Sequence, residues 1–223
     1  MLAIAIDGAC RRNGKPDCVS AGGVFILHLD ENLNVYNTAL LSNYEIQSTN
    51  QRGELLALLT ALDYVHEAQQ PAQIVTDSEY LFNAMTKRWY ENWLRKGWIT
   101  SSGTPVKNKD IWMEIMKSQW HCEAAGYETT YYHIKGHAVS FGKVTTQKLL
   151  NKDLTGRALY DAIEQRVSTT QLKEGMYEQI IDLSVKNNGF ELDDTTLKRF
   201  IVTNTVADAV ATKCVEAADA LMK

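Results

Sequence analysis

The sequence predicts an α/β protein in which helices flank a mixed five-stranded sheet. Three strand-like segments come first and are joined by short connections, which is typical of an antiparallel meander. A long amphipathic helix then leads to a fourth strand, and a right-handed crossover of this kind places that strand parallel to an earlier one. The expected strands cover residues 2–10, 21–29, 33–42, 72–76 and 128–135.

The first strand and the first helix have the clearest patterns. Residues 2–10 (LAIAIDGAC) are apolar at both alternating sets of positions until Asp7, as expected for a central strand that is buried on both faces. A Ser-Thr-Asn triplet can cap a helix over 51–67, which carries leucines at helical spacing. Pro71 ends that helix, and a short helix is expected over 78–85 after the next strand.

The later part of the chain is predicted to be largely helical. All five tryptophans fall between residues 86 and 120, on two expected helices joined by a connection over 97–105. A terminal amphipathic helix is expected over 204–221.

A block of residues, 138–203, separates the fifth strand from the terminal helix. Apolar side chains recur at helical spacing over 157–167 and 172–185, and a third helix is expected after the cap pair Asp193-Asp194. The sequence therefore predicts one domain, 1–223, that carries a helical insertion at 138–203.

Composition and charge exclude several classes of protein. No apolar run approaches the roughly 20 residues that a membrane-spanning helix needs, and the N-terminus lacks the layout of a signal peptide. The four cysteines are scattered without a CxxC pair, so we expect a cytoplasmic protein with reduced thiols. The net charge of -4 argues against indiscriminate coating of nucleic acid, although a local basic patch can still steer an anionic substrate.

Three acidic residues lie where a buried element would normally place an apolar side chain. Asp7 ends the first strand, Glu54 lies one turn into a strongly hydrophobic helix, and Asp77 follows a short central strand. Each alone is explained by a turn, by a helix cap or by the positive end of a helix dipole. Together, carboxylates that converge at strand ends without matching basic residues favour hard divalent cations such as Mg²⁺ or Mn²⁺.

Five segments resemble, in order, the motifs of type 1 ribonuclease H of the bacterial type. They are IDGAC (6–10), STNQRGELLAL (48–58), VTDSEYL (75–81), KGH (135–137) and NTVADAVA (204–211). The segment WYENWLRKGW…PVKNKDIW (89–98 and 105–112) is similar to the basic protrusion, or handle, of that family. The resemblance covers nearly all of 1–137 and 204–220, and it implies the ribonuclease H-like fold.

The resemblance implies an endonuclease that hydrolyses the RNA strand of an RNA–DNA hybrid. Position by position, the family's four metal-binding acids fall on Asp7, Glu54, Asp77 and Asp208, and its mobile catalytic histidine falls on His137. The implied cofactors are two Mg²⁺ ions, which Mn²⁺ can replace, and the implied products carry 5′-phosphate and 3′-hydroxyl ends.

Substrate contacts are implied around the cleavage position and on the handle. Glu54 and the backbone near Gly8 match positions that read the 2′-hydroxyl, the group that distinguishes RNA from DNA. Between residues 87 and 109 there are six basic residues against one acid, and phosphates of the DNA strand are their expected target. Trp89 and Trp93 are expected to pack within the handle rather than stack on bases. The substrate-binding candidates are Gly8, Asn13, Thr49, Asn50, Gln51, Lys87, Arg88, Arg95, Lys96 and Asn204.

The sequence departs from the family pattern at a few places, and two alternative functions stay open. Ala9, Gln51 and Glu79 differ from the common residues, and the block 138–203 replaces a short glycine-containing loop. One alternative is a DNA-directed nuclease of the same fold, such as a junction resolvase or an integrase-like enzyme. The other is a catalytically silent module that binds hybrid or docks a partner, although an unused carboxylate cluster costs stability through repulsion. We expect a monomer whose insertion is available to a protein partner.

Overall fold

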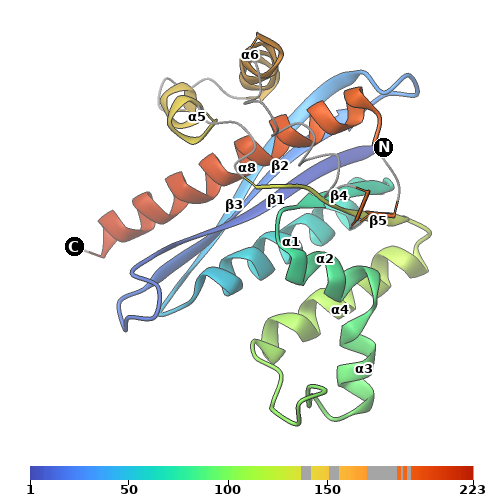
Figure 1. Cartoon of the computed structure of the whole chain (residues 1–223), viewed down its shortest axis with the longest axis vertical. Helices are drawn as coiled ribbons and strands as arrows, with labels where there is room; N and C mark the ends of the chain where they lie inside the picture. The colour runs from blue at the N-terminus through green and yellow to red at the C-terminus, as the bar shows by residue number, and fades with distance from the viewer. Residues whose placement is uncertain (137–141, 151–155, 170–184, 187, 190–191, 223) are drawn as a thin grey trace.

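The computed structural model describes residues 1–136, 142–150, 156–169, 185–186, 188–189 and 192–222. Its sheet has the strand order β3-β2-β1-β4-β5, and the mixed five-stranded sheet expected from the sequence is confirmed (Figure 1). The first three strands form an antiparallel meander, and β4 lies parallel to both β1 and β5. The strands are β1 (Leu2–Arg11), β2 (Val19–Leu29), β3 (Val35–Ile46), β4 (Ala72–Thr76) and β5 (Thr129–His133).

Helices cover both faces of the sheet. In Figure 1, α1 and α4 lie on one side of the sheet, and α8 crosses the other side together with α5 and α6. The helices are α1 (Asn50–Ala68), α2 (Glu79–Thr86), α3 (Trp89–Arg95), α4 (Lys109–Ala124), α5 (Gly142–Leu150), α6 (Gly156–Thr169) and α8 (Asp194–Leu221). Across the described residues, the search for a helix that combines membrane-spanning length with sufficient hydropathy finds none.

Strand β1 is buried on both faces, as the sequence predicts. Ile4 and Ile6 belong to the core that α1 covers, whereas Ala3 and Ala5 belong to the core that α8 covers. Side chains point alternately to the two faces of a strand. Asp7, two residues after Ala5, therefore continues the row that faces α8. A single strand therefore contributes to two hydrophobic cores and then places a carboxylate on the side of the sheet that α8 covers.

Helix α1 begins where the sequence predicts, at the Ser-Thr-Asn triplet. Thr49 is the N-cap, and its hydroxyl accepts a hydrogen bond from the backbone N–H of Arg52 at 3.4 Å. Leu55, Leu58 and Leu62 follow on the buried face. The cap and the leucine spacing fix both the start and the rotation of this helix.

The tryptophans hold the handle together, which confirms the packing prediction. Trp89 and Trp93 lie on α3 with ring centroids 6.2 Å apart, and the Trp93 ring meets that of Trp112 on α4 at 5.3 Å. Trp120 is also on α4. The prediction that all five tryptophans lie on two helices is wrong for Trp98. Trp98 lies in the connection, with a positive φ of 66°, because α3 has already ended at Arg95, three residues earlier.

The terminal helix is longer than the sequence indicates. Asp193 caps it by accepting a hydrogen bond from the backbone N–H of Thr196 at 2.9 Å, as expected for a helix start at this point. The expected boundary between residues 203 and 204 lies inside this one helix of 28 residues. No glycine or proline interrupts 194–221, so nothing in the local sequence stops the helix there.

The insertion contributes to the core on the α8 side. The helix expected over 157–167 is confirmed as α6, whereas most of the helix expected over 172–185 lies outside the described residues. Leu159 and Ile163 of α6 are fully buried with Phe200 of α8, so the apolar stripe of α6 is used for packing.

Candidate active site

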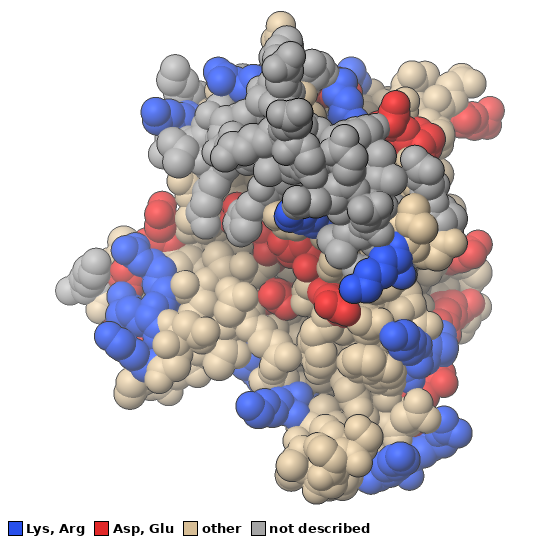
Figure 2. Space-filling model, in the orientation of Figure 1, with Lys and Arg blue, Asp and Glu red and all other residues tan. Residues whose placement is uncertain are grey.

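A cavity of about 550 Å³ lies where β1, α1, β4 and α8 meet. The four predicted carboxylates line it: Asp7 of β1, Glu54 of α1, Asp77 directly after β4 and Asp208 of α8. Glu216 of α8 is a fifth acid in the lining, which the sequence analysis missed. Figure 2 shows acidic side chains gathered in the middle of one face of the molecule, with Lys and Arg side chains around them. The fold therefore brings together the four predicted acids, although Asp7 and Asp208 are 201 positions apart in the sequence.

Asp7 is one of two cavity acids, with Asp208, whose residues are almost fully buried. Its residue is 8% exposed, and its Oδ1 accepts a hydrogen bond from the backbone N–H of Gly8 at 2.6 Å. Burial raises the pKa of Asp7 well above its usual value, and the charges of Asp77, Asp208 and Glu54 raise it further. The ionised form of this carboxylate therefore needs a compensating positive charge nearby.

Glu54 is held in place by two side-chain donors. Ser78 donates from its hydroxyl to Oε2 at 2.7 Å, and Asn50 donates from its amide to Oε1 at 3.3 Å. Burial raises the pKa of Glu54, the bond from Ser78 opposes that rise, and the charge of Asp77 adds to it. Ser78 was not among the residues predicted from the sequence, although its place directly after Asp77 is a usable signal.

Two glycines make room for these acids. A Cβ at Gly8 would lie 2.6 Å from the backbone nitrogen and 2.7 Å from the Cγ atom of Glu54. A Cβ at Gly136 would overlap the Oδ2 atom of Asp77. A side chain at either position would therefore displace one of the cavity carboxylates.

Helix α8 places Asp208 and Asn204 differently, although the two are one turn apart. Asp208 is 7% exposed and lines the cavity. Asn204 is 4% exposed and does not line it, and its Oδ1 has no hydrogen-bond partner among the described residues. The structure therefore does not bring Asn204 to the cavity surface. The predicted catalytic residue His137 lies outside the described residues.

Only some of the other predicted substrate-binding residues near the cavity line it. Gly8 and Asn50 line it, whereas the exposed Asn13 and Thr49 lie outside its lining. Arg11 is a basic lining residue that the sequence analysis missed, and its side chain is 50% exposed. Its position next to the IDGAC motif was the available signal.

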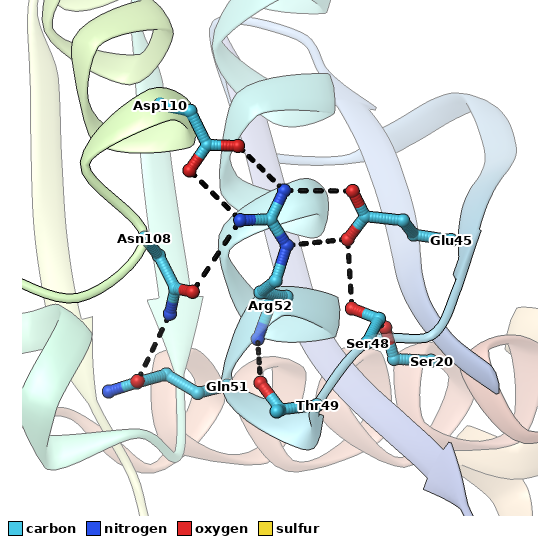
Figure 3. A network of polar contacts seen from close by, with 8 residues as sticks. All are labelled: Ser20, Glu45, Ser48, Thr49, Gln51, Arg52, Asn108 and Asp110. Carbon is cyan, nitrogen blue, oxygen red and sulfur yellow. Dashed lines mark hydrogen bonds and ion pairs between the residues drawn. The ribbon is translucent and has the colours of Figure 1, made fainter. Parts of the chain in front are cut away.

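A polar network ties the start of α1 to the handle (Figure 3). The guanidinium of Arg52 binds both carboxylate oxygens of Glu45, at 2.5 and 2.8 Å, and both of Asp110, at 2.9 and 2.8 Å. Gln51 accepts a hydrogen bond from the side-chain amide of Asn108 at 3.1 Å. The end of the handle connection is therefore fixed relative to the helix turn that carries Glu54.

The basic residues of the handle are not equivalent. Arg88 forms ion pairs with Glu91 at 2.7 Å and with Glu123 at 2.6 Å, so its charge is already compensated. Lys87, Arg95 and Lys96 are exposed. Among the predicted phosphate contacts, these three are better placed than Arg88 to meet a substrate.

The chemistry of the donor set suits a divalent cation. All four carboxylates offer hard oxygen ligands, and Asp7 experiences repulsion from the other three. Within the described part of the chain, no three His, Cys, Asp or Glu side chains are close enough together to form a ready-made metal centre. The donors fit Mg²⁺ or Mn²⁺ in kind and number.

Comparison with known proteins places these features in one family. The RNase H family model matches residues 1–151, a range that contains Asp7, Glu54 and Asp77 and stops before Asp208. A ribonuclease H of Chlorobaculum parvum is 34% identical over 137 residues, which cover 61% of this chain and 84% of the relative. A ribonuclease HI of Rickettsia prowazekii is 31% identical over 148 residues, which cover 66% of this chain and 87% of the relative.

Solved structures agree on the fold. The crystal structure of LC9-RNase H1, described as a type 1 RNase H with the type 2 active-site motif, has a TM-score of 0.52 at 21% identity. That match covers 70% of this chain and 74% of the other. A foamy viral protease-reverse transcriptase in complex with dsDNA has a TM-score of 0.50 at 20% identity, and covers 60% of this chain and 81% of the other.

Proposed function

The chain belongs to the RNase H family, and on that premise we propose that it hydrolyses the RNA strand of RNA–DNA hybrids at the acidic cavity. The observation that carries the proposal is that Asp7, Glu54, Asp77 and Asp208 line one cavity. A nuclease must stabilise negative charge on a phosphodiester, and a cavity of carboxylates does so only with cations bound.

We propose that these four carboxylates hold two divalent cations, Mg²⁺ or Mn²⁺. When bound, such ions supply Lewis acidity toward the phosphodiester and lower the pKa of a bound water. The protein's own groups orient the ligands: Ser78 and Asn50 hold Glu54, and the N–H of Gly8 holds Asp7. Hydrolysis of this class leaves 5′-phosphate and 3′-hydroxyl ends.

The handle is proposed to bind the strand that is not cut. Lys87, Arg95 and Lys96 are exposed on or beside α3, and phosphates are the ligands that such a cluster attracts. The Arg52 network fixes the handle connection to α1, so this basic surface keeps a constant position relative to Glu54. Binding is therefore expected to weaken as salt concentration rises.

A cleavage assay with matched substrates tests the proposal. We expect the protein to cut the RNA strand of a labelled RNA–DNA hybrid in Mg²⁺ and to leave a DNA duplex of the same sequence intact. Asp77→Asn should abolish cleavage and keep the wild-type circular dichroism spectrum. Asp161→Asn on α6, where Asp161 pairs with Arg157 at the surface, is the control and should cut normally.

The same assay separates the alternative functions. Cleavage of the DNA duplex in preference to the hybrid would indicate a DNA-directed nuclease of this fold. Binding of hybrid without cleavage in Mg²⁺ or Mn²⁺ would indicate a silent binding module. A shift of the melting temperature with Mg²⁺ that Asp7→Asn removes would support the metal site independently of activity.

A further inference from the structure

Two cysteines meet at the end of the first hairpin. Cys10 lies near the end of β1, and Cys18 lies directly before β2. In the antiparallel register Cys10 faces Ser20, so Cys18 is its diagonal neighbour across the strand pair. Their Sγ atoms are 2.6 Å apart, which is closer than the separation of about 3.5 Å or more at which non-bonded atoms rest.

The two thiols have different access to solvent. Cys18 is fully buried, whereas Cys10 is partly exposed and lines the same cavity as Asp7. A reagent can therefore reach Cys10 first, and the neighbouring sulfur can then react from inside the protein. The other two cysteines lie elsewhere: Cys122 on α4 donates to the carbonyl of Leu62, and Cys214 lies on α8.

We propose that Cys10 and Cys18 are a modification site, at which oxidised glutathione or a similar small disulfide converts the two thiols into an intramolecular disulfide at the rim of the acidic cavity. The deprotonated Cys10 sulfur attacks one sulfur of the oxidant, forms a mixed disulfide and releases one glutathione thiolate. The Cys18 sulfur, on losing its proton, attacks the Cys10 sulfur and releases the second. The oxidant gains two electrons, and the two cysteine protons end on two reduced glutathione molecules.

The surroundings set the rate of this exchange. Burial and the hydrogen bond with Cys18 raise the pKa of Cys10 to about 12, partly opposed by the charge of Arg12. The thiolate is the reactive form, so exchange is slow at neutral pH and accelerates as pH rises. The pair is thus a slow site rather than a rapid sensor.

The bond would restrain the turn that connects β1 and β2. Arg12 already holds this turn, since it binds the carboxylate of Asp17 at 2.6 Å and that of Asp219 on α8. Arg11, the last residue of β1 before this turn, lines the cavity. Because the folded chain already presents the sulfurs side by side, closing the loop mainly restricts the unfolded chain and raises the melting temperature.

The test uses the full-length protein in buffers of defined ratios of reduced to oxidised glutathione. After equilibration at about pH 8, where exchange is faster, the protein is acid-quenched, denatured and alkylated, and labels are counted by mass spectrometry. We expect two of the four thiols to be lost together under oxidising conditions, with a peptide cross-link between positions 10 and 18. Cys10→Ser should keep its other three thiols alkylatable, and Cys214→Ser, the matched control, should still lose two.

The outcomes decide the proposal in both directions. Reversal by dithiothreitol, with a higher melting temperature for the oxidised form, supports it. Four alkylatable thiols at every ratio would overturn it, as would a glutathione adduct on Cys10 alone or a cross-link between two chains. A disulfide that lowers the melting temperature would also overturn it, because the sulfurs would then not be ready to be joined. None of these results depends on whether the protein cuts RNA.

Discussion

Replacement of Arg52 by methionine tests how the handle is joined to the rest of the fold. The change keeps an unbranched apolar stem and removes the guanidinium, which binds two carboxylates, each through two oxygens. The Arg52 side chain is only 18% exposed. Exposed ion pairs contribute about 0.2–1 kcal/mol each, and these pairs are well aligned but partly open to water. We expect a loss of about 1–2 kcal/mol, or roughly 2–8 °C in melting temperature for a chain of this size.

The pH dependence of the difference in stability between wild type and Arg52→Met tests whether the ion pairs of Arg52 cause it. Arg52 lowers the pKa of Glu45 and the pKa of Asp110, so its stabilisation is fully present above the unfolded values near 4. It is lost as pH falls through the lower, folded values. The difference in melting temperature between wild type and Arg52→Met should therefore be largest at neutral pH and shrink below about pH 4.

Thermal unfolding followed by circular dichroism at several pH values measures both effects. Arg52→Lys is the control, since it keeps the charge but loses the two-oxygen geometry, and it should fall between wild type and Arg52→Met. Equal stability of Arg52→Met and wild type at neutral pH would refute the role of the network. So would a difference that grows on acidification.

Three further substitutions have defined outcomes. Gly136→Ala should displace the Asp77 carboxylate and reduce hybrid cleavage with little change in hybrid affinity. Unchanged cleavage in a steady-state assay would contradict the overlap expected between the new Cβ and Asp77. Asp193→Ala removes the cap of α8 and should cost about 1 kcal/mol in urea unfolding, whereas Asp193→Asn should cost less. Arg11→Ala should weaken hybrid binding and lower the slope of log affinity against log salt by about 1 if it meets a phosphate; an unchanged slope would remove Arg11 from the binding surface.

The sequence predicted the sheet well because its signals are local. The alternation in 2–10, the cap at Thr49 and the short strand before Asp77 each depend on a few neighbouring residues, and each element is found where it was expected. The parallel direction of β4 relative to an earlier strand followed from one rule of crossover handedness. These elements carry three of the four predicted cavity acids.

The parts that the sequence did not predict depend on contacts between distant residues. The helix expected after Asp193-Asp194 and the helix expected over 204–221 are one continuous α8, and the local sequence carries no signal that joins or separates them at residue 203. The role of Ser78 and the burial of Asn204 follow from how α1, α2 and α8 pack against the sheet. The diagonal meeting of Cys10 and Cys18 depends on strand register, which the spacing of cysteines alone does not reveal.

Asp208 is the residue on which the central claim depends most, since it reaches the cavity on a helix that begins at Asp194, inside the insertion. The most direct measurement is the rate of RNA-strand cleavage of a labelled hybrid in Mg²⁺ by wild type and by Asp208→Asn, with folding checked by circular dichroism. We predict specific cleavage by the wild type and a loss on the order of 100-fold or more in the variant. Hybrid cleavage by Asp208→Asn at the wild-type rate, or a wild type that leaves the RNA strand intact, would contradict the account.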